Sequence, residues 1–214
     1  MPNTQEMSRK KAVGDLKKTL ILDAAKRVFE REGLEKASLR AIAKEAGYTP
    51  AALYFHFESK EAVYADLLAD SLLVLKTEVE HAADQHADPA ENFRAAAQAY
   101  FRFYLENPKD LDLGFYLWSG GMSPKGLGKG RDDKLNSGLM DALQPIRAAA
   151  FALSHSALAA QRSQTEIFAY ANGVLLLVHT GRIRLFEISE MEMMDQFVTS
   201  QIKILASTES LEND

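Results

Sequence analysis

Four large side chains follow one another in the stretch AGYTPAALYFHFESKEAVY, residues 46–64: Tyr54, Phe55, His56 and Phe57. A phenol and an imidazole can hydrogen-bond to phosphate oxygens, and an exposed phenyl ring offers an apolar edge to a thymine methyl group. A helix here has only about two turns, a rise of roughly 11 to 12 Å. It can bury one narrow stripe, so these side chains cannot all be core.

The helical phase places these four side chains on different sides of the helix. At about 100° per residue, Leu53 and Phe57 fall on one side of the helix, which we expect to be buried. The opposite side would approach the floor of a DNA major groove, and its members are small or apolar: Ala51, Ala52 and Phe55. Tyr54 and His56 fall on the flanks, where they can reach phosphates. If Phe55 instead packs in the core, this phase is wrong.

Two short helices joined by a glycine-containing turn would position these side chains. Ser38 is a good N-cap for the first helix, which ends before Gly47. Thr49 is the N-cap of the second, with Pro50 at its first helical position. This is the pattern of a helix-turn-helix. Further polar candidates for the DNA backbone or a base edge lie at the helix starts: Ser38, Arg40, Thr49 and Lys60.

Charge is distributed unevenly along the 214 residues. Residues 1–60 hold 12 Lys and Arg against 8 Asp and Glu, while the remainder holds 13 against 22, within a net charge of -5. This asymmetry suggests a basic module joined to an acidic one. The chain has no cysteine, which excludes disulfides and thiolate metal sites.

Apolar residues recur at helical spacing along nearly the whole chain, so the expected fold class is all-α with about nine helices. The first helix is expected to end at Gly33, and Pro145 inside region 132–158 predicts a kink or two pieces. Starts of the other helices are predicted from caps and first-turn prolines at Ser59, Asp88-Pro89, Asn107-Pro108, Ser163-x-x-Glu166 and Ser189-x-x-Glu192.

The run from Lys18 to Leu67 resembles the DNA-binding domain of the tetracycline-repressor (TetR) family of bacterial regulators. The resemblance is carried by ILDAAKRVFEREG and ASLRAIAKEAGYTPAALYFHFESKEAVYADLL, most specifically by IAKEAG and LYFHFESKEAV. It implies a homodimer whose two helix-turn-helix units bind successive major grooves of a palindromic operator, usually to repress transcription until a small molecule releases it. Tyr48 departs from the family's commoner small aliphatic residue and is either additional core or an added DNA contact.

The resemblance also assigns roles to matching positions. The implied groove contacts are Thr49, Pro50, Ala51, Ala52 and Phe55, and the implied phosphate contacts are Lys18, Ser38, Tyr54, His56 and Lys60.

The second half is rich in aromatic residues, which suits either plain core packing or an apolar ligand cavity between helices. Candidate effector contacts are Phe101, Tyr104, Phe115, Tyr116, Trp118, Phe168, Asn172 and His179.

The last two helices carry more apolar surface than one buried stripe of an amphipathic helix needs, which favours a dimer interface.

These features predict four segments: a flexible basic arm (1–15), the helix-turn-helix domain (16–64), a helical ligand-binding and dimerisation domain (65–208) and a tail (209–214). The boundary is expected inside the fourth helix, near Tyr64, without a flexible linker. A continuous helix there could transmit movement from one half to the other.

Other site classes find little support. His81 and His86 are five residues apart and do not share a helix face as i,i+4 metal ligands would. Gly126, Gly128 and Gly130 follow no strand, and we expect neither catalysis nor a cofactor. The longest apolar run, VLLLV, is too short to span a membrane and the N-terminus lacks a signal sequence, so we expect a cytoplasmic protein.

Two competing functions remain open: a helical small-molecule carrier or enzyme that kept the fold, and a helical adaptor that binds protein through its terminal helices. Neither predicts salt-sensitive duplex binding.

Overall fold

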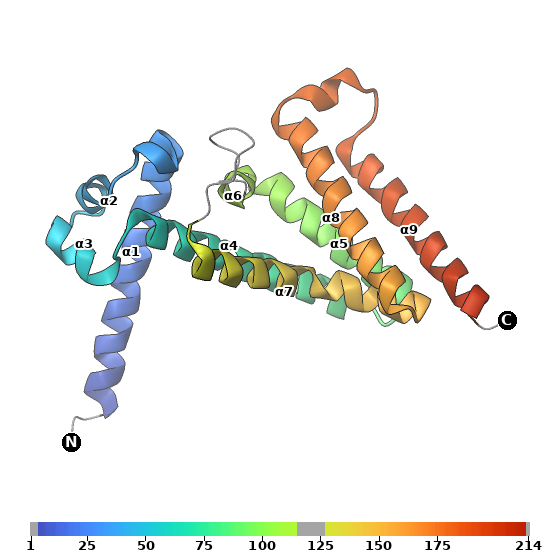
Figure 1. Cartoon of the computed structure of the whole chain (residues 1–214), viewed down its shortest axis with the longest axis horizontal. Coiled ribbons are helices and arrows are strands. Elements are labelled where there is room, and N and C mark those ends of the chain that lie inside the picture. The colour runs from blue at the N-terminus through green and yellow to red at the C-terminus, as the bar shows by residue number, and fades with distance from the viewer. Residues whose placement is uncertain (1–3, 115–126, 213–214) are drawn as a thin grey trace. The chain divides into compact units, whose positions relative to one another are not determined.

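The computed structural model of the chain describes residues 4–114 and 127–212. In these ranges the expected all-α class with about nine helices is confirmed, and one short 3-10 helix is added. The elements (Figure 1) are α1 Thr4–Lys36, α2 Leu39–Glu45, α3 Pro50–His56, α4 Lys60–Asp84, α5 Pro89–Glu106, α6 Pro108–Gly114, α7 Lys129–Ser154, α8 Ala157–His179, η2 Arg182–Leu185 and α9 Glu190–Glu212.

Most of the predicted helix starts are confirmed by capping hydrogen bonds. The side chains of Ser38, Thr49 and Ser59 accept from the backbone N–H three residues on, at 3.1, 3.2 and 3.1 Å. Ser189 caps α9 in the same manner, and Asp88 caps α5 by accepting from the backbone N–H of Ala90, two residues on. These caps satisfy N–H groups that a helix start would otherwise leave without a partner.

The predicted helix start at Ser163 is wrong. Helix α8 begins seven residues earlier, where Ser156 is the N-cap. The preceding break is made at His155, whose φ of 53° lies in the left-handed region. Ser163 is buried inside α8 and donates to Gln201 Oε1 of α9 at 3.0 Å.

Two further expectations differ from the structure. Helix α1 begins at Thr4 and so includes most of the segment 1–15 that was expected to be an arm. Its regular path is interrupted at Gly33 (φ 73°, ψ 163°), the residue predicted to end it. Pro145 lies inside α7, which runs as one helix, so of the two predicted alternatives the division into two pieces is wrong.

The described chain divides into two compact units, Met1–Asp70 with Leu113–Leu135, and Ser71–Asp112 with Asn136–Asp214. The division falls inside α4, six residues after Tyr64. Helix α7 also crosses it, because its first turns belong to the first unit. Each unit therefore takes its residues from two separate stretches of chain.

The first unit has a core built from α1 to α4. Its fully buried side chains include Ile21, Val28, Ile42, Leu53 and Val63. Phe29 and Tyr64 stack edge to face with centroids 5.0 Å apart, and the Tyr64 hydroxyl donates to the Leu113 carbonyl at 3.0 Å.

The second unit is held by the packing of α5 with α8 and α9 (Figure 1). Its fully buried side chains include Phe93, Phe101, Ile167, Leu175 and Met194. Arg94 of α5 pairs with Asp195 of α9 at 2.7 Å, and Gln164 of α8 donates to the Leu143 carbonyl at 3.0 Å.

A search of the described helices for a stretch long and apolar enough to span a bilayer finds none.

Candidate nucleic-acid interface

The α2–turn–α3 segment is fixed by its backbone as well as by its caps. Gly47 adopts φ 72°, a left-handed conformation that ends α2 at little cost because glycine has no Cβ. The next amide, of Tyr48, donates back to the Ala43 carbonyl at 2.8 Å. Thr49 is extended, and its hydroxyl oxygen caps α3. The turn therefore sets where the second helix begins.

The side chains of α3 point as its helical phase predicts. Leu53 is fully buried and Phe57, just after the helix, is 5% exposed. Phe55 is 87% exposed and Tyr54 56% exposed, and Ala51 and His56 are also exposed. The rings of Phe55 and His56 meet edge to face at 5.5 Å. Phe55 is thus not part of the core, and the predicted helical phase is confirmed.

Several other predicted contacts lie on the surface of the same segment. Ser38, Arg40, Thr49 and Pro50 are exposed, and Ala52 and Tyr48 are half-buried. Ser38 and Thr49 use an oxygen lone pair for their caps, which leaves each hydroxyl proton available to donate.

Two predicted phosphate ligands are already bonded within the protein. Lys18 Nζ lies 2.7 Å from Asp66 Oδ2. This hydrogen bond raises the pKa of the Lys18 ammonium above its ordinary value. Lys60 Nζ donates at 2.7 Å to the carbonyl of Glu35, near the end of α1. Sequence reasoning gave both lysines to DNA and did not foresee these partners, although an ammonium has three donors and can add another acceptor.

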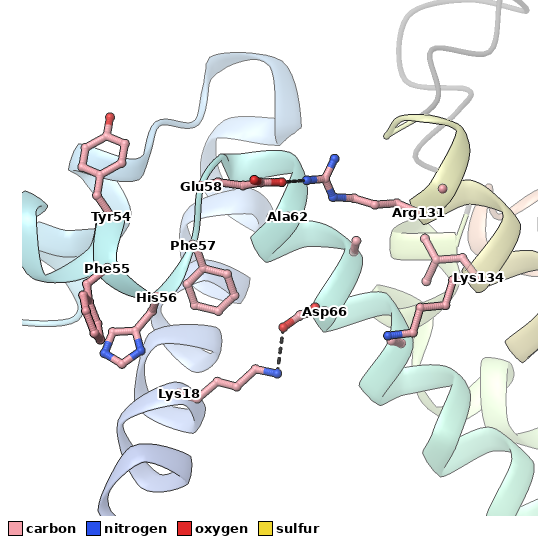
Figure 2. Close-up of a pocket in the computed structure, with 14 residues that line it drawn as sticks. Lys18, Tyr54, Phe55, His56, Phe57, Glu58, Ala62, Asp66, Arg131 and Lys134 are labelled. Atoms are coloured by element: carbon pink, nitrogen blue, oxygen red, sulfur yellow. Dashed lines mark hydrogen bonds and ion pairs between the residues drawn. The ribbon is translucent and has the colours of Figure 1, made fainter.

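A cleft of about 610 Å³ opens beside the end of α3, and we name it the α3–α7 cleft (Figure 2). It lies within the first unit, between α1, the segment Tyr54–Glu58, α4 and the first turns of α7. Glu58 is ion-paired with Arg131 of α7, whose guanidinium also donates to the Leu127 carbonyl at 3.1 Å. Sequence reasoning missed Arg131 and Lys134, because no local pattern links them to a segment more than 70 residues earlier.

The predicted effector residues are only partly described. Phe115, Tyr116 and Trp118 lie outside the described residues. Phe101 and Tyr104 are buried, Phe168 and Asn172 are half-buried, and His179 is exposed.

Some of these candidates are brought together around Tyr100, which sequence reasoning left out of the site. Its hydroxyl and Asn172 Nδ2 are 3.1 Å apart, and its ring meets that of Tyr104 at 5.3 Å. His179 Nε2 lies 3.3 Å from the Tyr104 carbonyl oxygen. Burial raises the pKa of both the Tyr100 and Tyr104 phenols.

Among the described residues no cluster of three or more His, Asp or Glu side chains could hold a metal ion.

Comparison with known proteins matches residues 21–67 to the bacterial regulatory proteins of the tetR family. The uncharacterized HTH-type transcriptional regulator YdgC of Bacillus subtilis (strain 168) is 31% identical over 102 residues, 45% of this chain and 52% of YdgC. The HTH-type transcriptional regulator UidR of Escherichia coli (strain K12) is 44% identical over 54 residues, 25% of this chain and 28% of UidR. The chain thus matches about half of the first relative's length and about a quarter of the second's.

Similarity of fold extends further along the chain. The transcriptional regulator FadR from Bacillus subtilis, solved in complex with stearoyl-CoA, superposes with a TM-score of 0.66 over 89% of this chain and 98% of its own, at 16% identity. At this identity the likeness concerns the fold alone.

Proposed function

Because residues 21–67 place the chain in the TetR family of bacterial regulators, we propose that it is a dimeric, ligand-responsive repressor that binds a palindromic operator. The family is one of regulators rather than of enzymes. We place its action in the cytoplasm, where bacterial DNA is found.

The exposure of α3 is the observation that carries this proposal. A phenylalanine 87% exposed beside an exposed tyrosine and histidine forms a contiguous aromatic patch, and such patches mark interaction sites. Two small residues, Ala51 and Ala52, precede this ring and permit the helix to approach a groove floor closely. In a major groove Phe55 would contact a thymine methyl, while Tyr54 and His56 donate to phosphates.

The effector would bind in the second unit, near the Tyr100 and Asn172 hydrogen bond. Apolar surroundings with a few polar groups are typical of small-molecule sites, so we expect an apolar or amphipathic ligand. The stearoyl-CoA bound by FadR, a protein of similar fold, supports an amphipathic ligand.

Dimerisation would use the last two helices. Thr165, Ala169, Gly173 and Leu176 form one exposed stripe along α8. Small side chains at this spacing let a second helix approach closely, and exposed Leu176 and Ile204 supply apolar area. A second copy that packs there would bury this stripe.

Helix α4 would couple the two functions, because it runs without interruption from the first unit into the second. Effector binding would favour a state in which the two α3 helices no longer match half-sites about 34 to 36 Å apart. A coupling free energy of about 1 to 3 kcal/mol is sufficient to change operator affinity several-fold to a hundredfold.

Selection of bound duplexes from a random pool tests the proposal. A recovered palindrome with one helical turn between half-site centres is the expected result. Binding of the selected duplex should weaken steeply as salt rises, with log affinity falling by about 0.9 per decade of salt for each phosphate that a lysine or arginine neutralises. Failure to enrich any duplex, or binding independent of salt, would favour a carrier or an adaptor instead.

A further inference from the structure

The α3–α7 cleft exists because one face of α4 is small. Ala62, Ala65 and Ala69 recur along that face and line the cleft, and Phe57 and Leu135 add apolar surface. Larger side chains at these alanines would occupy the space. The volume, about 610 Å³, lies within the range of small-molecule sites, about 300 to 1,000 Å³.

The charge of the lining favours an anion. Its two carboxylates are each paired with a cation: Asp66 with Lys18 at 2.7 Å, and Glu58 with Arg131. Lys134 is a third cation; it is exposed and extends from α7 toward the side of Asp66 (Figure 2). These three cations and two carboxylates together carry one net positive charge.

The aromatic wall of the cleft belongs to α3. Tyr54, Phe55 and His56 line the cleft and also form the surface that we assign to DNA. Figure 2 shows Phe55 and His56 on the opposite side of the cleft from Lys134. A molecule that spans the cleft would contact the same side chains as an operator.

We propose that the α3–α7 cleft binds a small organic anion with an aromatic body, such as an aromatic carboxylate or sulfonate, in direct competition with DNA. The apolar floor takes the ring system and Lys134 takes the anionic group. The competition rests on the proposed function, whereas anion binding itself does not. This ligand acts on the DNA-reading surface directly and needs no signal from the second unit.

The probe is 8-anilinonaphthalene-1-sulfonate, an aromatic anion whose fluorescence rises on binding, and its uncharged counterpart is N-phenyl-1-naphthylamine. We expect the full-length protein to bind the sulfonate more tightly than the amine. Lys134→Gln should weaken sulfonate binding about two- to tenfold and leave binding of the amine unchanged, since only the ion pair is lost. Ala69→Leu, which fills the cleft, should weaken both.

Matched controls lie outside the cleft: Arg102→Gln on α5 and Ala152→Leu on α7, both at exposed positions. Circular dichroism confirms that each variant is folded. Equal sulfonate binding by Lys134→Gln, Ala69→Leu and the two controls would overturn the proposal, as would absence of sulfonate binding. Equal affinity for both probes would overturn the requirement for an anion.

Competition between the sulfonate and DNA is measured with the duplex selected from the random pool. Direct competition makes the apparent operator Kd rise in proportion to sulfonate concentration without a plateau, whereas an effector in the second unit gives a plateau set by its coupling. A plateau would overturn the competitive mechanism. If no duplex binds at all, the proposed function fails, and the titration without DNA still decides whether the cleft holds an anion.

Discussion

Phe55 and Leu53 are two residues apart on α3 and have opposite environments, one 87% exposed and the other fully buried. Exposed surface substitutions usually change stability by less than about 0.5 kcal/mol, whereas removing a buried leucine costs about 2 to 5 kcal/mol. We therefore predict that Phe55→Ala keeps the unfolding free energy of the wild type and changes the base preference at one position of each half-site. Leu53→Ala should unfold at much lower urea.

The measurement for this pair is urea unfolding together with duplex selection on Phe55→Ala. Tyr54→Ala is the companion variant, because loss of a phosphate hydrogen bond weakens binding to all duplexes alike. The phenol is uncharged, so the salt slope should stay that of the wild type. Unfolding of Phe55→Ala at low urea would contradict the role given to this ring.

Two buried phenols predict a pH dependence. Burial raises the pKa of Tyr100 and of Tyr104 above the ordinary value of about 10. Between the unfolded and folded pKa values the folded state binds more protons than the unfolded state, so stability falls as pH rises above about 10. Below that pH the contribution is fully present.

Absorbance at 295 nm should therefore show that the phenols of Tyr100 and Tyr104 ionise only when the protein unfolds at alkaline pH. Tyr104→Phe should reduce that delayed step by one phenol. Ionisation of all seven tyrosines in one step before unfolding would contradict the burial of these rings.

For single residues, the sequence predicted the side-chain orientations that follow from helical phase. It missed the bonds that side chains make to residues far away in the sequence. The orientation of Tyr54 to Phe57 follows from 100° per residue and one buried stripe. The bonds of Lys18 to Asp66 and of Lys60 to the Glu35 carbonyl join residues 48 and 25 positions apart. No local pattern records such pairs.

Among the helices, the starts marked by strong local signals were predictable. Ser38, Thr49, Ser59 and Asp88 each combine a capping side chain with a helix-forming sequence that follows. Ser163 has the same signature but lies inside a helix, because its neighbours on both sides also favour helix. The real start depends on the left-handed backbone at His155, and histidine gives little sign of it.

Gly47 makes a prediction about the turn between α2 and α3. A Cβ added there would meet no heavy atom within 4 Å, so the cost of substitution comes from the backbone alone. At φ 72° that cost is about 1 to 2 kcal/mol for a residue with a Cβ. We predict that Gly47→Val destabilises the protein by at least this amount in urea unfolding.

Asparagine tolerates the left-handed region better than a β-branched residue does. Gly47→Asn should therefore lie between Gly47→Val and the wild type. Equal stability of the two variants would show that the turn changes its conformation when glycine is replaced.

The ion pair between Glu58 and Arg131 fastens the segment after α3 to the first turns of α7. We predict that Arg131→Met leaves global stability within about 1 kcal/mol, since exposed pairs contribute little. It should nevertheless speed amide hydrogen exchange in the peptide that covers residues 49–64, because local opening is favoured. Arg147→Met, on the same helix, is the matched control and should leave that peptide unchanged.

Assembly can be tested on the exposed face of α8. Leu176 is 62% exposed, and a carboxylate there would be buried without a partner in the proposed dimer. We predict that Leu176→Glu sediments as a monomer and loses most of its affinity for the full palindrome, with unchanged circular dichroism. Leu73→Glu, equally exposed on α4, should remain dimeric. A dimeric Leu176→Glu protein would place the interface elsewhere.

For the whole molecule, the sequence predicted the all-α class. It did not predict that residues 113–114 and 127–135 group with the first unit rather than the second. Charge asymmetry and helix periodicity describe neighbours in sequence, while this grouping depends on contacts such as that of the Tyr64 hydroxyl with the Leu113 carbonyl.

That grouping has a consequence for chimeric regulators. A graft that joins residues 1–64 of this chain to the C-terminal half of another regulator would leave the Tyr64 hydroxyl without the Leu113 carbonyl and Glu58 without Arg131. The transplantable module is discontinuous, and it comprises the N-terminal segment through Asp70 together with Leu113–Leu135. A hybrid that exchanges both segments should keep its operator recognition. A hybrid joined at a single position inside α4 keeps the helix-turn-helix but loses its hydrogen bond to the Leu113 carbonyl and its ion pair with Arg131.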